Sequence, residues 1–190
     1  MTQGFHMKMT FLLIASVIAA VPAYAQDTLK TANIQRYYNP VKLDLLGAAS
    51  VMPADKYGFK PTPVQMTVGN VAEHLEFANY LLCTIFSGTP HPETAKDSLP
   101  DSVKALWPKD TLVARLRASF TFCKAAFDKV SDANLADSVA TGAPFRAKKN
   151  VRARLVILFM TDLVDHYSQM ANYMRAMGMT PPSSYPPPKK

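Results

Sequence analysis

The 190-residue sequence predicts an all-α domain folded as a four-helix bundle. Two observations lead to this fold class. Four long stretches carry apolar residues at the spacing of an amphipathic helix, and no stretch alternates apolar and polar residues as a half-buried strand does. Hydrophobic residues make up 48% of the chain and charged residues 18%, which excludes a disordered chain and leaves enough apolar surface for one core.

The first two predicted helices lie in the N-terminal half of the chain. The first covers about residues 28–49 and contains Pro40, where we expect a kink or a break because proline cannot donate a backbone hydrogen bond. Residues 52–63 follow as a proline-rich loop. The second helix begins near Thr67, a candidate N-cap, and ends near Gly88.

The other two predicted helices lie in the C-terminal half. The third covers about residues 108–130, and Asp110 or Thr111 is expected to cap its first turn. The fourth is the longest, over about residues 147–177, and Gly178 follows it as a natural C′ residue. Proline, glycine and small polar residues mark two surface connections, at residues 89–108 and 131–145.

The first 25 residues have the three parts of a secretory signal peptide. Lys8 supplies the positive charge, residues 11–21 form an apolar run that is short for a membrane span, and Ala23-Tyr24-Ala25 matches a small-x-small cleavage site. We therefore predict cleavage after Ala25, a mature domain over residues 26–180, and a periplasmic or secreted location. An uncleaved membrane anchor is the alternative.

The remainder of the chain excludes two classes of partner. No second segment is long and apolar enough to cross a bilayer, so we expect no stable membrane span in the mature chain. The formal net charge is +7, but the basic residues are dispersed and do not alternate with aromatic residues, so we expect no nucleic-acid partner. Residues 181–190 form a proline- and lysine-rich tail that is expected to be extended and mobile.

Export would place the two cysteines in an oxidising compartment. Cys83 lies on the second predicted helix and Cys123 on the third, and these helices can bring the two thiols to a common height if they are antiparallel neighbours. We expect them to form one disulfide that staples the bundle. Two buried free thiols are the alternative.

Ligand-type residues lie on the inner stripes of two predicted helices. Asp162 and His166 are four residues apart, so their side chains lie one turn apart on one face of the fourth helix. His74 lies on the inner side of the second helix, so the three side chains could converge on one cation. Three protein ligands with open positions are typical of a catalytic metal site, and this set suits zinc, nickel, iron or manganese.

A simpler interpretation fits the same residues. A histidine on a helix face is more often a hydrogen-bonded core residue than a metal ligand, and Asp162 could pair with a protonated His166. Spacing within one helix is a weak signal, so the residues alone leave metal binding open.

Several segments resemble the DinB superfamily of four-helix-bundle proteins, in particular its exported members. The two most specific are the MPADKYGFKPTP loop at residues 52–63 and the C-terminal pattern formed by DHYSQ at 165–169, YMR at 173–175 and GMTPPSS at 178–184. The VAEH segment at residues 71–74 also fits. The resemblance covers nearly the whole mature chain.

The resemblance implies a DinB-like fold and a divalent-metal site. His74 and His166 match the first and last ligand positions of the family's usual histidine triad, and Asp162 stands where many members have histidine. Aspartate is a competent ligand, so a His/Asp/His site is expected. Gln169, common in the family pattern, lies one turn after His166 and could hydrogen-bond a bound water, and Asp165 could orient a ligand, although a solvated acid is the preferred interpretation of that residue.

Two functions are consistent with this resemblance. The first is a metal-dependent hydrolase or thiol transferase that acts on a small molecule of unknown identity. The second is a non-catalytic bundle that binds a small ligand or a partner. Homodimers are common in bundles of this kind, so the chain could form a homodimer. Tyr173 is expected to be a packing residue.

Overall fold

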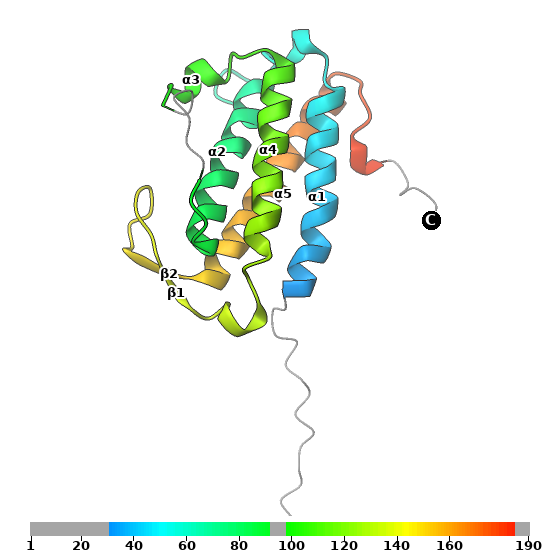
Figure 1. The fold of residues 1–190 in the computed structure, drawn as a ribbon. Coiled ribbons are helices and arrows are strands. Elements are labelled where there is room, and N and C mark those ends of the chain that lie inside the picture. Colours follow the sequence, from blue (N-terminus) through cyan, green and yellow to red (C-terminus); the bar gives the residue numbers. More distant parts are fainter. Residues whose placement is uncertain (1–30, 92–97, 185–190) are drawn as a thin grey trace, which may run out of the picture.

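A computed structural model describes residues 31–91 and 98–184 of the chain. Its four long helices are α1 (Thr31–Val51), α2 (Val68–Ser87), α4 (Lys109–Phe127) and α5 (Arg152–Ala176). They stand side by side as a bundle in which α2 packs on α4 and α5, and α1 packs on α5 and α4 (Figure 1). The predicted all-α four-helix bundle is confirmed. The predicted signal peptide lies outside the described residues.

Aromatic rings from all four helices meet in the core. Neighbouring ring centroids lie 5.0–6.3 Å apart, and the ring planes are tilted or edge-to-face, within the distance range that is favourable for aromatic pairs. The cluster consists of Tyr38, Phe86, Phe120, Phe127 and Phe159, all at most 4% exposed. Burial of these rings and of the leucines around them holds the four helices together.

The helix α1 runs through Pro40 without a break, so a break at this position is not observed. Pro40 is exposed, and Tyr38 and Leu45 anchor the helix to the core on either side of it. Most helix stability in proteins comes from such packing rather than from intrinsic propensity. The packing of α1 therefore offsets the roughly 3 kcal/mol that an interior proline costs.

The helix ends agree with the sequence at two positions and differ at one. Thr67 caps α2 through a capping box with Asn70, and Gly178 follows α5 with a φ of +73°. The predicted cap of α4 is wrong, because Pro108 occupies the N-cap position and makes no side-chain cap bond. Asp110 lies one residue inside the helix start, at a position from which it complements the helix dipole instead.

A short β-hairpin precedes α5 and corrects the expectation that the chain has no strand. Strands β1 (Ser138–Ala140) and β2 (Lys149–Val151) pair antiparallel, with Val139 opposite Asn150. The helix α5 therefore begins at Arg152 and not near residue 147. Strands of three residues are too short to show a period of two, so the sequence pattern could not reveal them.

Three 3₁₀ turns and one further helix complete the described structure: η1 (Ala54–Lys56), η2 (Asp132–Asn134), η3 (Pro182–Ser184) and α3 (Asp101–Lys104). The turn η3 lies at the start of the predicted tail, where Pro182 packs beside Gly47 of α1 and the Ser183 amide donates to the Tyr167 hydroxyl at 2.8 Å. Residues 181–184 are therefore packed on the bundle and not extended. No helix in the described residues has the length and apolarity of a membrane span.

The helix α3 lies against the start of α2, inside a segment that the sequence analysis treats as a connection. The Lys104 ammonium is buried there and contacts the carboxylates of Glu73 at 2.8 Å and Asp101 at 3.0 Å. Burial disfavours the charged ammonium, but the bonds to the two carboxylates outweigh burial and raise the pKa of Lys104. The Lys104–Glu73 ion pair therefore holds α3 on α2, while the pair with Asp101 lies within α3.

Gly69 allows this close approach, and its replacement provides a test. A Cβ at position 69 would clash with the backbone carbonyl oxygen of Ala105, which cannot move like a flexible side chain. We expect Gly69→Ala to lower the free energy of unfolding by about 1–3 kcal/mol. The measurement is urea denaturation followed by circular dichroism. Gly58→Ala is the matched control, because a Cβ there meets nothing within 4 Å; equal midpoints for the two variants would contradict the packing described.

Candidate metal centre

Three ligand-type side chains converge between α2 and α5. The Oδ1 atom of Asp162 lies 3.4 Å from Nε2 of His74 and 3.6 Å from Nε2 of His166. The two imidazole rings are tilted against each other with centroids 4.6 Å apart. The i, i+4 spacing puts Asp162 and His166 on one face of α5, and the packing of α2 on α5 brings His74 to them.

The spacing of the donor atoms fits a bound cation. One ligand atom from each of the three residues lies within 4.8 Å of the other two. Four ligands at about 2.1 Å from a tetrahedral metal are separated by roughly 3.4 Å, which matches the distances from Asp162 to both histidines. The residues present therefore fit a divalent metal such as zinc without large rearrangement.

The second carboxylate oxygen of Asp162 is an independent indication of a cation site. Oδ2 is buried and has no hydrogen-bond partner among the described residues. An unpaired buried carboxylate oxygen costs free energy, and a coordinated cation removes this cost. The unpaired Oδ2 atom therefore favours a cation at this site.

The site opens to solvent on the α2 side. The side chain of His74 is 37% exposed, whereas those of Asp162 and His166 are 22% and 10% exposed. The bond to the Asp162 carboxylate raises the pKa of His74, although partial burial acts in the opposite direction. Asp162 and His166 therefore lie mostly inside the bundle, and the His74 side of the cluster is exposed to solvent.

The structure places Gln169 against His166 itself. The Oε1 atom of Gln169 lies 3.0 Å from Nδ1 of His166, the ring nitrogen that points away from Asp162. Gln169 is thus a direct partner of the proposed ligand, and the expected bond to a bound water is not needed to explain it. Partners of this kind orient metal-ligating histidines in many metalloproteins.

The structure does not bring Asp165 to the other three residues. Its side chain is exposed and lines an apolar groove between α1 and α5, together with Tyr37 and Val164. One residue of helix turns the side chain by about 100°, so the neighbour of a ligand points to a different face. The preferred interpretation of Asp165 as a solvated acid agrees with this position.

Tyr173 has a polar role that the sequence analysis missed. Its ring is buried against Phe59, as a packing residue would be, but its hydroxyl accepts a bond from Gln169 Nε2 at 2.7 Å and donates to the Met66 carbonyl at 2.8 Å. The i, i+4 spacing from Gln169 was a signal for this contact. The partner at Met66 is 107 residues away and could not be inferred from spacing.

The cysteines form a disulfide at the opposite side of α2. Cys83 and Cys123 are bonded, with their Cα atoms 5.4 Å apart, and both are fully buried. The bond joins α2 to α4, but the two helices run parallel and not antiparallel, because the contacts Glu76–Arg115, Asn79–Ser119 and Cys83–Cys123 advance in the same direction along both. It therefore fixes the helix that carries His74 to the bundle core.

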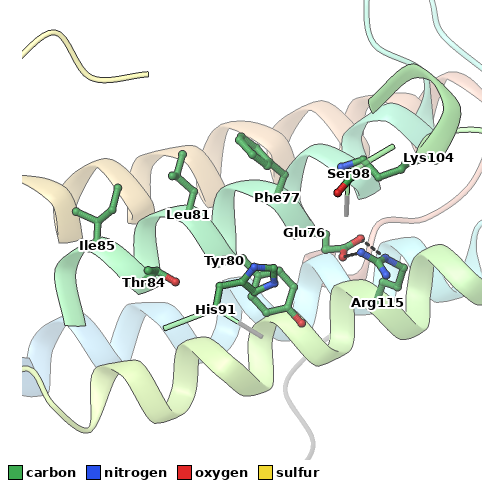
Figure 2. A pocket seen from close by; sticks show the side chains of 10 residues that line it. All are labelled: Glu76, Phe77, Tyr80, Leu81, Thr84, Ile85, His91, Ser98, Lys104 and Arg115. Carbon is green, nitrogen blue, oxygen red and sulfur yellow. Dashed lines mark hydrogen bonds and ion pairs between the residues drawn. The ribbon is translucent and has the colours of Figure 1, made fainter. Parts of the chain in front are cut away.

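A separate cavity of about 310 Å³ lies on the outer side of α2 (Figure 2). Figure 2 shows Phe77 and Leu81 along one edge of the helix, and Glu76 paired with Arg115 below it. The Arg115 Nε atom donates to Glu76 at 2.9 Å, and Lys104 in the same lining is held by Glu73 and Asp101. The cationic side chains Arg115 and Lys104 in this lining are thus paired with carboxylates. Within the described residues, the group of side chains close enough to hold a metal ion is the His74 cluster.

Comparisons with known proteins place this arrangement in a family. Residues 43–170 match the family model described as DinB superfamily. A DinB-like protein from Bacillus cereus has a similar structure, with a TM-score of 0.64 at 18% identity over 82% of this chain and 98% of the other. A DinB-like protein from Bacillus subtilis gives 0.58 at 15% identity over 78% and 94%.

A mycothiol-dependent maleylpyruvate isomerase shares the same fold, with a TM-score of 0.59 at 12% identity. The match covers 74% of this chain and 60% of the isomerase. A sequence comparison with functionally curated proteins found no match. The family model extends from α1 to α5 and spans the whole His74, Asp162 and His166 cluster, and we conclude that the chain belongs to the DinB superfamily.

Proposed function

We propose that this chain is a metal-dependent enzyme that binds one divalent ion through His74, Asp162 and His166 and acts on a small molecule, as a thiol transferase or a hydrolase. The observation that carries the proposal is the partly buried Asp162 carboxylate, whose Oδ1 faces two imidazole nitrogens and whose buried Oδ2 has no hydrogen-bond partner in the described part of the chain. Zinc, nickel, iron and manganese all suit this donor set.

The residues of the site have distinct tasks in this proposal. His74 and His166 present ring nitrogens as neutral donors, and Asp162 neutralises part of the charge of the ion. A bound divalent ion would supply Lewis-acid activation of a water molecule or a thiol at the open side. The partly exposed side chain of His74 marks this open side, because three protein ligands leave coordination positions free.

The thiol branch is supported by a structural neighbour named for its dependence on mycothiol. This similarity is one of fold at low identity, so the reaction of the neighbour enters only as a guide to which substrates to test. Hydrolysis is the second branch, because the same activation applies to water.

We also propose that the protein is exported. The N-terminal 25 residues match a cleaved signal peptide, and the Cys83–Cys123 disulfide agrees with folding in an oxidising compartment.

Removal of the metal tests the proposed enzyme. Untagged protein is stripped with a chelator, and each metal is added back before assay with activated esters and with a low-molecular-weight thiol plus an electrophile. We expect activity in one of these assays to disappear with the metal and to return with it. Asp165→Asn, which removes an exposed carboxylate from the same helix, is the control and should behave as the wild type. Failure of the stripped protein to take up any of the four metals would overturn the proposal.

A further inference from the structure

A hydrogen-bonded chain connects the proposed ligand on α5 to the start of α2. It runs from Nδ1 of His166 to Oε1 of Gln169 at 3.0 Å, from Nε2 of Gln169 to the Tyr173 hydroxyl at 2.7 Å, and from that hydroxyl to the Met66 carbonyl at 2.8 Å. Tyr173 is 1% exposed and His166 is 8% exposed, so water competes little for these bonds. This hydrogen-bonded chain is therefore a well-defined part of the site.

The backbone carbonyl at one end sets the direction of every bond. A carbonyl only accepts, so the Tyr173 hydroxyl must donate to Met66. The same hydroxyl then accepts from Gln169, which must turn its NH₂ group toward Tyr173 and its oxygen toward His166. An amide oxygen cannot donate, so Nδ1 of His166 carries the proton. In the reverse orientation, the Gln169 oxygen would face the Tyr173 oxygen, whose proton is already donated to Met66, so two acceptors would face each other.

We propose that Tyr173 and Gln169 are positioning residues that hold His166 as its Nδ1–H tautomer and so leave the Nε2 lone pair facing Asp162 and His74. The role in metal affinity rests on the proposed function, whereas the tautomer itself is a property of the metal-free protein. A neutral imidazole has one donor and one acceptor nitrogen, and only the acceptor nitrogen binds a metal. Without the chain, part of the His166 population would carry its proton on the nitrogen that must bind.

The chain also ties together the two helices that supply the ligands. Met66 immediately precedes Thr67, the N-cap of α2, and Tyr173 and Gln169 lie on α5 with His166. A shift of the α2 start would break the bond to Tyr173 and release Gln169 to rotate. The orientation of one ligand is therefore coupled to the position of the helix that carries the other histidine.

Nitrogen NMR of the metal-free protein tests the tautomer directly. In protein with ¹⁵N-labelled histidine at alkaline pH, long-range proton–nitrogen correlations distinguish an Nδ1–H ring from an Nε2–H ring. We expect His166 in the wild type to be Nδ1–H, and Tyr173→Phe to convert it to a mixture or to the Nε2–H form. We also expect this variant to bind zinc about 10–100-fold more weakly.

Two further variants separate positioning from folding. The first combines Tyr173→Phe with Gln169→Glu. Both oxygens of the introduced carboxylate can only accept a hydrogen bond, so the Nδ1–H tautomer of His166 should return although the tyrosine hydroxyl is still missing. Tyr167→Phe is the matched control, since it removes a hydroxyl from the same helix that accepts from Ser183 and lies outside the chain. Its His166 should remain Nδ1–H.

The outcomes distinguish this inference from the proposed function. An Nε2–H ring in the wild type, or an unchanged tautomer in a folded Tyr173→Phe variant, would overturn the positioning role. If the His166 ring is Nδ1–H and responds to the variants as expected, but the protein binds no zinc, the positioning role of the hydrogen-bonded chain is supported. The proposal of a metal-dependent enzyme is then contradicted.

Discussion

Replacing His166 by alanine is expected to lower the affinity for zinc by at least about a hundredfold. The imidazole is the most buried of the three proposed ligands, and loss of residues that only support a ligand already costs 10–100-fold in affinity. Removal of the ring also leaves the inward-facing oxygen of Gln169 without its donor. Competition with a chromophoric chelator measures the affinity, and metal analysis of untagged protein measures the content.

Two variants at other positions control this result. Asp165→Asn changes an exposed carboxylate one residue before His166 and should leave zinc affinity unchanged. Asp162→His places a histidine where the related family pattern commonly has one, and it should retain measurable binding because imidazole is also a zinc ligand. If His166→Ala binds zinc as tightly as the wild type, the ion is held elsewhere and the proposed site is wrong.

Removing the disulfide is expected to have the largest effect on stability. The bond closes a loop of 40 residues, and the loss of its constraint on the unfolded chain corresponds to about 4 kcal/mol. For a domain of this size the melting temperature should fall by roughly 8–16 °C. The double variant Cys83→Ala, Cys123→Ala is suitable, because both positions are fully buried and alanine introduces no polar group.

Reduction of the wild type provides the internal control for that measurement. A reductant should lower the melting temperature of the wild type toward that of the double variant and should leave the variant unchanged. Denatured, non-reduced wild type should contain no free thiol. Two free thiols per chain, or a double variant as stable as the oxidised wild type, would contradict a structural disulfide.

The helical class and the residues of the candidate site were predictable from the sequence. Periodic apolar residues predict four helices because each stripe must be buried, and the i, i+4 spacing of Asp162 and His166 puts them together within α5. Thr67 and Gly178 were predictable as helix ends because capping depends on the local backbone. Each of these features arises from residues a few positions apart.

The contacts of these residues could not be predicted from the sequence, because they depend on how the helices pack. His74 and Asp162 are 88 positions apart, and only the packing of α2 on α5 brings them to 3.4 Å. The Met66 carbonyl that directs the Tyr173 hydroxyl, and the Ala105 carbonyl that excludes a Cβ at Gly69, are backbone atoms without a sequence signature. Hydrophobic periodicity indicates which face of a helix is buried, but the partner of that face depends on packing between distant segments.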